Sequence, residues 1–196
     1  MDIIDTILEV WRLKETDRTG FVVECVDHPE SVGDHSFGAA FLAFVLSTGR
    51  KDIDRSKVVY MALIHDLAES EVGDILVDWK VAVKKREGKQ VDGKHHGVTE
   101  EEKYVLEQQA MQRLAARLPN GEEILALWEE NEKKETPEAC FVRSIDKLDM
   151  FLQALWYERS QGKDFTSWFD DKRNEIGDDG VRTVYEAILL RRKTNK

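Results

Sequence analysis

The sequence predicts an all-α protein, and three observations lead to that prediction. Only three prolines occur in 196 residues, and the chain between them is rich in Ala, Leu, Glu and Lys, which favour helices. Apolar residues recur three and four positions apart, as they do along one face of a helix. Alternating strand patterns are almost absent. We therefore expect helices joined by turns.

The first elements are defined by their end signals. A first helix is expected over Asp2 to Lys14, and a turn-rich stretch follows from Thr16 to Glu30. Ser31 with Asp34 three residues later resembles a capping pair, and Gly49 supplies a stop. These signals predict a second helix between Ser31 and Gly49.

The third predicted helix contains the dipeptide His65-Asp66. Asp54 can cap it, and its apolar pattern continues to about Glu69, before Gly73 breaks the pattern. The following segment, Lys84 to Gly97, is basic and contains several glycines, so we expect a loop there. The pair His95-His96 within it is interpreted as part of that loop.

Three more helices are expected in the second half of the chain. Thr99 and Glu102 have the spacing of a capping box for a helix that continues to about Leu118. Thr136 before a proline is another strong start, because proline at the first helical position loses no hydrogen bond. This helix carries Asp146. The segment Val181 to Arg192 is predicted to form a last amphipathic helix.

Composition and charge limit the number of domains, the kinds of partner and the cellular location that we expect. The length and the 41% hydrophobic content favour a single domain over residues 1–196. A net charge of −10 and a pI of about 5.1 argue against binding a nucleic-acid polymer. Cys25 and Cys140 stand far apart, which favours a reducing, cytoplasmic location. No apolar stretch approaches the length of a membrane span, so no membrane association is expected.

The candidate chemistry centres on His65-Asp66. Adjacent helical residues diverge by about 100 degrees, so both side chains can reach one ion between them. Glu69 falls one turn later, and Gly73 lets the chain turn back to present a second carboxylate, Asp74. The bland alternative is that the dipeptide arose by chance in a helical bundle.

Two distant residues share apolar helix faces and should point inward. His35 lies on a stripe with Ala39, Leu42 and Leu46, and Asp146 lies on one with Val142 and Met150. Mixed nitrogen and oxygen ligands suit Mn²⁺, Co²⁺, Fe²⁺, Zn²⁺ or Ni²⁺ without selecting among them. The metal's identity therefore stays open.

The order of these motifs resembles the HD-domain metal-dependent phosphohydrolases, and within them the 5'-deoxynucleotidase branch. The resemblance covers roughly residues 7–160 and leaves the C-terminal helices, 164–194, as accessory elements. It implies a compact multi-helix HD-domain bundle. The matching segments are Arg18 to Phe21, Pro29 to His35, His65 to Glu69, Val72 to Ile75, Leu127 to Glu130, and Asp146.

The resemblance implies a role for each matching residue. One divalent ion would be held by His35, His65, Asp66 and Asp146. Glu69 would orient or deprotonate the attacking water, and Asp74 would be the second acid or base. Arg18 would bind the phosphate, since a guanidinium is a planar bidentate donor. The substrate would be a small nucleotide, and the protein would be a homodimer.

The resemblance also implies a nucleotide pocket. The segment Ile75, Leu76 and Val77 would form one wall, and Lys80 is a weaker substrate candidate. Thr19 stands where the bacterial members of this branch have a large aromatic residue, and Phe21 would take over that place. This departure puts discrimination against ribose in question.

Three alternatives stay open. The chain could be another HD-type nucleotide phosphohydrolase, acting on cyclic nucleotides or on ppGpp, although the additional ligands or acidic motif typical of these are not visible. It could also be a non-catalytic regulatory protein that uses the metal structurally, but such a protein has no need of Glu69 and Asp74. The third is the chance helical bundle.

Overall fold

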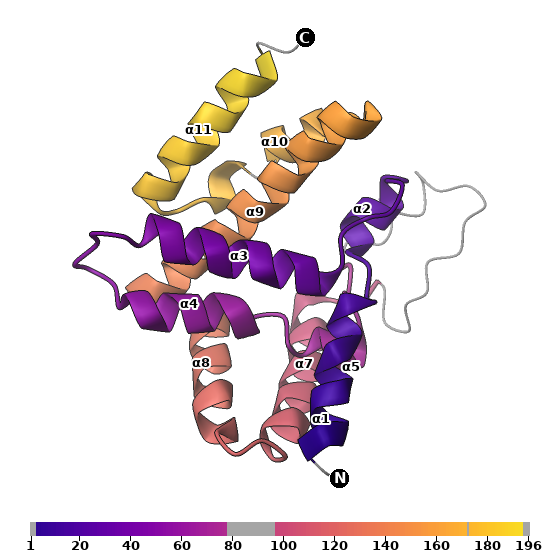
Figure 1. The fold of residues 1–196 in the computed structure, drawn as a ribbon, viewed down its shortest axis with the longest axis vertical. Helices are drawn as coiled ribbons and strands as arrows, with labels where there is room; N and C mark the ends of the chain where they lie inside the picture. Colours follow the sequence, from indigo (N-terminus) through magenta and orange to yellow (C-terminus); the bar gives the residue numbers. More distant parts are fainter. Residues whose placement is uncertain (1–2, 78–96, 172, 194–196) are drawn as a thin grey trace. The chain divides into compact units, whose positions relative to one another are not determined.

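The structure, a computed structural model, describes residues 3–77, 97–171 and 173–193. Every regular element among these residues is a helix, and the chain there contains no strand (Figure 1). The all-α prediction is confirmed. None of the described helices combines the length and apolarity needed to cross a bilayer.

The chain divides into two compact units. The first contains Met1–Asp34 and Asp66–Ala126, and the second contains His35–His65 and Leu127–Lys196. The chain therefore passes from the second unit to the first at the peptide bond between His65 and Asp66. Two helices continue through the other crossing points: α3 (Val32–Leu46) and α8 (Gly121–Lys133).

The first unit is built around the short helix α5, which packs against α7, α1 and the 3-10 helix η1. The predicted capping box opens α7, because the Thr99 hydroxyl accepts from Glu102 N and the Glu102 carboxylate accepts from Thr99 N. The stretch predicted to be turns contains one short helix, α2. The elements of this unit are α1 (Ile3–Val10), η1 (Trp11–Lys14), α2 (Thr19–Val23), α5 (Glu69–Val72) and α7 (Glu100–Ala115).

The predicted helix through His65 to Glu69 is wrong in one respect. Helix α4 (Arg55–Ile64) ends just before His65, and Glu69 begins the separate helix α5. In a continuous helix the Ala62 carbonyl would accept from Asp66 N, but here the His65 side chain donates to it. The next N–H bonds span three residues, as from Glu69 N to Asp66 O. The chain therefore turns tightly between the two helices.

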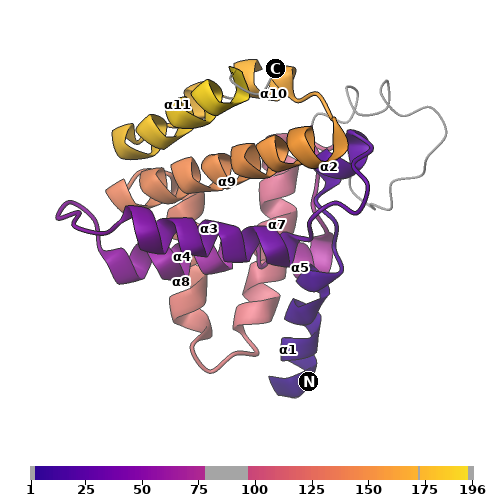
Figure 2. The ribbon, with the colours of Figure 1, turned by 45° about the horizontal axis from the view of Figure 1, so that its top comes forward.

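The second unit is organised by α9 (Pro137–Gln161), which packs against α4 and α11. Both views show α9 lying between α11 and α3, with α4 beside α3 (Figures 1 and 2). Thr136 caps α9 as predicted, since its hydroxyl accepts from Ala139 N. The remaining elements are α10 (Thr166–Asp171), η2 (Arg173–Glu175) and α11 (Asp179–Lys193).

An aromatic cluster holds the last helices on α9. The Phe151 ring lies 4.9 Å from that of Phe169 and 4.7 Å from that of Tyr185, measured between centroids. The Tyr185 hydroxyl donates to the Phe169 carbonyl at 2.7 Å, so its polar atom is satisfied inside the core. This packing positions the segment of α9 that carries Asp146.

Candidate metal centre

His35 is fully buried in the first turns of α3, and one of its nitrogens has a fixed role. Its Nδ1 lies 2.8 Å from Oδ2 of Asp149 on α9. A carboxylate only accepts, so Nδ1 carries the proton and Nε2 keeps its lone pair. Gly38, three residues further along α3, makes this contact possible, because a Cβ there would lie 2.2 Å from Asp149 Oδ1.

His65 is oriented in the same way by a different partner. Its Nδ1 lies 2.7 Å from the Ala62 carbonyl oxygen, which can only accept, so its Nε2 also keeps a lone pair. The Nε2 atoms of His35 and His65 are 3.2 Å apart. Two nitrogen lone pairs at this distance repel each other unless a cation lies against both. The pair is therefore arranged as a ligand pair rather than as a hydrogen bond.

Asp146 adds an oxygen to the two nitrogens. Its Oδ1 lies 3.3 Å from His35 Nε2, and its Oδ2 lies 3.1 Å from Lys147 Nζ. Burial raises the pKa of the Asp146 carboxyl, but nearby positive charge, above all the Lys147 ammonium, outweighs burial and holds that pKa well below its usual range. The group is therefore an ionised carboxylate.

Within the second unit, His35 Nε2 thus lies against both His65 Nε2 and an oxygen of Asp146, so three of the four predicted metal ligands are linked through His35. Two imidazole nitrogens and a carboxylate oxygen form a donor set that fits a divalent transition ion. The fourth predicted ligand, Asp66, is the next residue along the chain after His65.

The first unit holds the remaining predicted acids in contact with Arg18 and Thr19. Arg18 Nη1 lies 3.1 Å from Asp66 Oδ2. Thr19 N donates to Asp74 Oδ2 at 2.7 Å, and the Thr19 hydroxyl donates to the Asp74 carbonyl at 2.8 Å. Gly73 has a φ of +77°, which glycine adopts without strain and which turns the chain to present Asp74. Two consecutive residues therefore orient both acids.

Glu69 differs from these acids because one of its oxygens is buried without a hydrogen-bond partner among the described residues. Its residue is 3% exposed. Burial raises the pKa of the Glu69 carboxyl well above its ordinary value, and Asp66 and Asp74 raise it further against the opposing charges of Lys103 and Arg18. A buried oxygen left unpaired costs about 1–3 kcal/mol. Such a group is a candidate for proton transfer.

The predicted nucleotide-binding residues differ in their exposure. Phe21 and Ile75 are 1% and 4% exposed, so their side chains belong to the core of the first unit. Leu76 and Val77 are half-buried and offer some surface to a ligand. Lys80, the basic segment and the pair His95-His96 lie outside the described residues, with only Gly97 of that segment described.

Two residues were missed from the sequence. Asp149 follows Asp146 by three positions, and this helical spacing of two aspartates was the available signal. Lys103 on α7 had none, because a lysine in a glutamate-rich helix is usually interpreted as a solvated ion pair. Its Nζ lies 3.4 Å from the Ile75 carbonyl and 3.5 Å from Glu107 Oε1.

The charge state of Lys103 follows from its surroundings. Burial lowers the pKa of the Lys103 ammonium, but Glu107 and Glu69, with Asp74 and Asp66, more than reverse this effect. Its pKa therefore lies above its ordinary value, and the side chain is a permanent cation beside the acids of the first unit.

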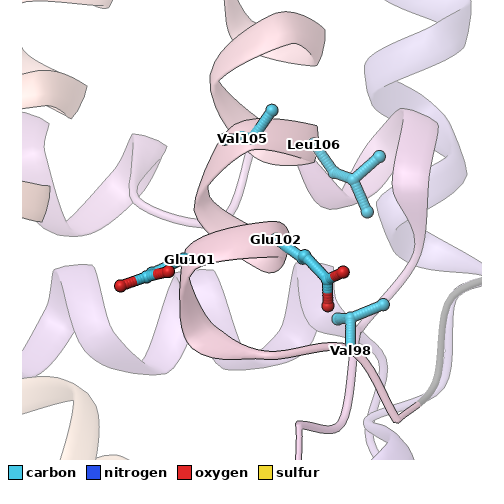
Figure 3. Close-up of a pocket in the computed structure, with 5 residues that line it drawn as sticks. All are labelled: Val98, Glu101, Glu102, Val105 and Leu106. Carbon is cyan, nitrogen blue, oxygen red and sulfur yellow. The ribbon is translucent and has the colours of Figure 1, made fainter.

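A shallow hollow of about 400 Å³ lies along the first turns of α7 (Figure 3). None of its lining residues is a candidate ligand or catalytic group. Two of them are glutamates, which would repel a phosphate. The hollow is lined by Val98, Glu101, Glu102, Val105 and Leu106.

Comparison with known proteins identifies the family. Residues 10–182 match the family described as HD domain. The chain is 36% identical over 178 residues to 5'-deoxynucleotidase HDDC2 of Dictyostelium discoideum, covering 84% of this chain and 85% of that one. It is 32% identical over 190 residues to the protein of the same name from Homo sapiens, covering 95% and 84%.

A solved structure agrees in fold. A conserved hypothetical protein from Pyrococcus furiosus superimposes with a TM-score of 0.74 at 29% identity, over 95% of this chain and 99% of that one. The family match, the relatives and the paired histidines all agree with the resemblance stated from the sequence. The chain belongs to the HD domain family of metal-dependent phosphohydrolases.

Proposed function

We propose that this protein is a divalent-metal-dependent phosphomonoesterase, a 5'-deoxynucleotidase that releases phosphate from deoxyribonucleoside 5'-monophosphates. The observation that carries the proposal is the close pairing of the His35 and His65 Nε2 atoms, with the Asp146 carboxylate beside His35, while each Nδ1 is tied to an acceptor. The substrate class is supported by the relatives that carry the name 5'-deoxynucleotidase.

One divalent ion is proposed, held by His35, His65, Asp66 and Asp146. Mn²⁺, Co²⁺, Fe²⁺, Zn²⁺ and Ni²⁺ all suit these donors. When bound, such an ion neutralises phosphate oxygens and lowers the pKa of a bound water. The protein's part is to keep the nitrogen donors unprotonated on the ligand side, which Asp149 and the Ala62 carbonyl do.

The acid–base work is assigned to Glu69 and Asp74. Glu69 has the buried unpaired oxygen and the raised pKa that suit a group accepting a proton from the attacking water. Asp74, held by the Thr19 amide, is proposed as the group that, in its protonated form, supplies a proton to the leaving 5'-oxygen. Asp74 is held in position by a hydrogen bond, whereas Glu69 is confined by its burial.

Arg18 is assigned to the phosphate. Its guanidinium contacts Asp66 through Nη1, and a planar guanidinium suits the paired oxygens of a phosphate. Contacts to the sugar and the base stay predictions. They are assigned to the wall at Ile75 to Val77, to Thr19 and Phe21, and to Lys80. Selection of deoxyribose over ribose depends on them.

We further propose that residues 1–196 act as one HD domain. The family match over residues 10–182 runs through both compact units, which supports this reading. The cytoplasmic location and the homodimer stay predictions.

The proposal is tested by phosphate release from purified protein. With Mn²⁺ or Co²⁺ we expect faster release from dAMP and dTMP than from AMP. Activity on cyclic nucleotides or ppGpp but not on monophosphates would move the protein to another HD-type class. Release from no substrate with any of the five metals would contradict an enzymatic role and favour a regulatory protein.

A further inference from the structure

The two oxygens of Asp146 have different partners. Oδ1 lies 3.3 Å from Nε2 of His35, a proposed metal ligand, and Oδ2 lies 3.1 Å from the ammonium of Lys147. The side chains of Asp146 and Lys147 are 21% and 19% exposed, so dissolved salt screens their attraction only in part. The ammonium therefore holds Oδ2 and leaves Oδ1 for an ion.

The contact between Asp146 and Lys147 does not follow from their positions on α9. Adjacent helical residues diverge by about 100 degrees and do not face each other. A lysine side chain is also flexible, so it needs a second partner to stay in one place. Glu175 supplies that partner, because its Oε2 lies 3.8 Å from the Lys147 ammonium nitrogen. Lys147 thus pairs with two carboxylates.

Glu175 lies on η2, in the accessory C-terminal segment, and this segment is fixed to α9 beside Asp146. The hydroxyl of Ser144, a fully buried residue of α9, accepts from the backbone N–H groups of Gly177 and Asp178, at 3.1 Å each. Ser144 precedes Asp146 by two positions. The residues that follow Glu175 are therefore anchored close to the proposed ligand.

We propose that Lys147 is a positioning residue of the metal site, which holds Asp146 as a ligand through one oxygen, and that Glu175 keeps Lys147 in place. This inference rests on the proposed metal site. It gives the C-terminal segment a part in that site, because Glu175 is the link between η2 and the Asp146 carboxylate.

Holding one oxygen of Asp146 affects which ion the site prefers. Ca²⁺ takes about six to eight oxygen ligands and often binds both oxygens of one carboxylate. Co²⁺ has a higher affinity for imidazole nitrogen and needs fewer oxygen atoms. With Oδ2 held by Lys147, Asp146 offers only Oδ1, so Lys147 should favour Co²⁺ over Ca²⁺.

Competition between the two ions tests the role of Lys147. The measured quantity is the Ca²⁺ concentration that displaces half of the bound Co²⁺, determined by metal analysis after equilibrium dialysis. Both ions carry the same charge, so the lost charge of a substituted lysine acts nearly equally on both and largely cancels. Lys147→Met should lower the displacing concentration about tenfold, the lower end of the range for lost support of a ligand. Lys147→Arg keeps a donor and should keep the concentration.

Two further variants locate the effect. Arg143→Met is the matched control, because it removes the same charge one turn earlier on α9, from a side chain that pairs with Glu175 at 3.5 Å. It should keep the displacing concentration. Glu175→Gln should lower that concentration by less than Lys147→Met, because the Lys147 ammonium keeps its contact with Asp146. Unchanged thermal melting shows that the variants fold.

The outcomes separate this inference from the proposed function. An unsubstituted protein that binds no Co²⁺ would overturn the proposed metal site and this inference with it. Normal Co²⁺ binding with an unchanged displacing concentration in Lys147→Met overturns the role of Lys147 alone. An equal fall in Arg143→Met would show that charge sets the preference and would overturn the positioning role. An unchanged value in Glu175→Gln overturns the part of the C-terminal segment.

Discussion

The two compact units carry opposite kinds of site chemistry. In the second unit, His35 and His65 have their Nδ1 atoms tied to acceptors, so their Nε2 atoms meet as lone pairs, with Asp146 beside that of His35. In the first unit the acids are held by donors, except for the unpaired oxygen of Glu69. A metal ligand needs a hydrogen bond on its far side that fixes its orientation. A group that moves a proton instead needs an oxygen that is free of competing hydrogen bonds.

The largest effect is expected from removing a nitrogen donor. His65→Ala should abolish measurable metal binding and lower kcat/KM at least ~1000-fold, because the donor set loses one of its two imidazoles. Metal content measured on the dialysed variant, together with phosphate release from dAMP, checks this. A variant that keeps both would remove His65 from the ligand set.

Glu69→Gln should separate proton transfer from metal binding. We expect kcat to fall ~10²–10⁴-fold, the range typical of a lost general base, with metal affinity nearly unchanged. Glu71→Gln is the matched control, since Glu71 is exposed on the same helix and pairs with Arg113. Equal activity in the two variants would exclude Glu69 as the base.

Asp149→Asn should weaken the metal site indirectly. Loss of a carboxylate that orients a ligand histidine costs ~10–100-fold in metal affinity. Gly38→Ala should act in the same direction, because its Cβ would collide with the Asp149 carboxylate. A titration with Mn²⁺ should show both losses, and excess metal should restore part of the activity. Unchanged metal affinity in both variants would show that Asp149 does not support the metal site.

The smallest effect is expected at Lys103. Its charge opposes the raised pKa of the Glu69 carboxyl, so Lys103→Met should raise that pKa further. If Glu69 acts as a base, the acid limb of kcat/KM should then move to higher pH, with about tenfold lower activity at neutral pH. Lys103→Arg keeps the charge and should keep the limb in place. A limb that stays fixed in Lys103→Met would show that this charge does not act on the base.

The sequence predicted those features whose signals are local. The reciprocal bonds of Thr99 with Glu102 and the Thr136 cap lie within a few residues, so the starts of α7 and α9 could be read from the chain. The resemblance to the HD-domain family rested on short motifs in a fixed order, and the family match confirms it.

The features that the sequence did not predict depend on contacts between residues far apart in the chain or on a side chain that bonds a backbone carbonyl. Asp149 reaches His35 across 114 positions, and the space for it exists only because Gly38 lacks a side chain. At the end of α4 the His65 imidazole bonds the Ala62 carbonyl, a side-chain contact that helix propensity does not describe. In each case the three-dimensional partner decides the outcome.

The central claim is that one metal, held by the histidine and aspartate cluster, is required for hydrolysis of a deoxynucleotide. The most direct measurement is phosphate release from dAMP by metal-depleted protein titrated with Mn²⁺. We expect no phosphate release without metal. In the unsubstituted protein the rate of release should rise with added Mn²⁺ and level off at one ion per chain. In Asp146→Asn the rate should not rise. Full activity in the metal-depleted protein, or one bound ion with no release of phosphate, would contradict the claim.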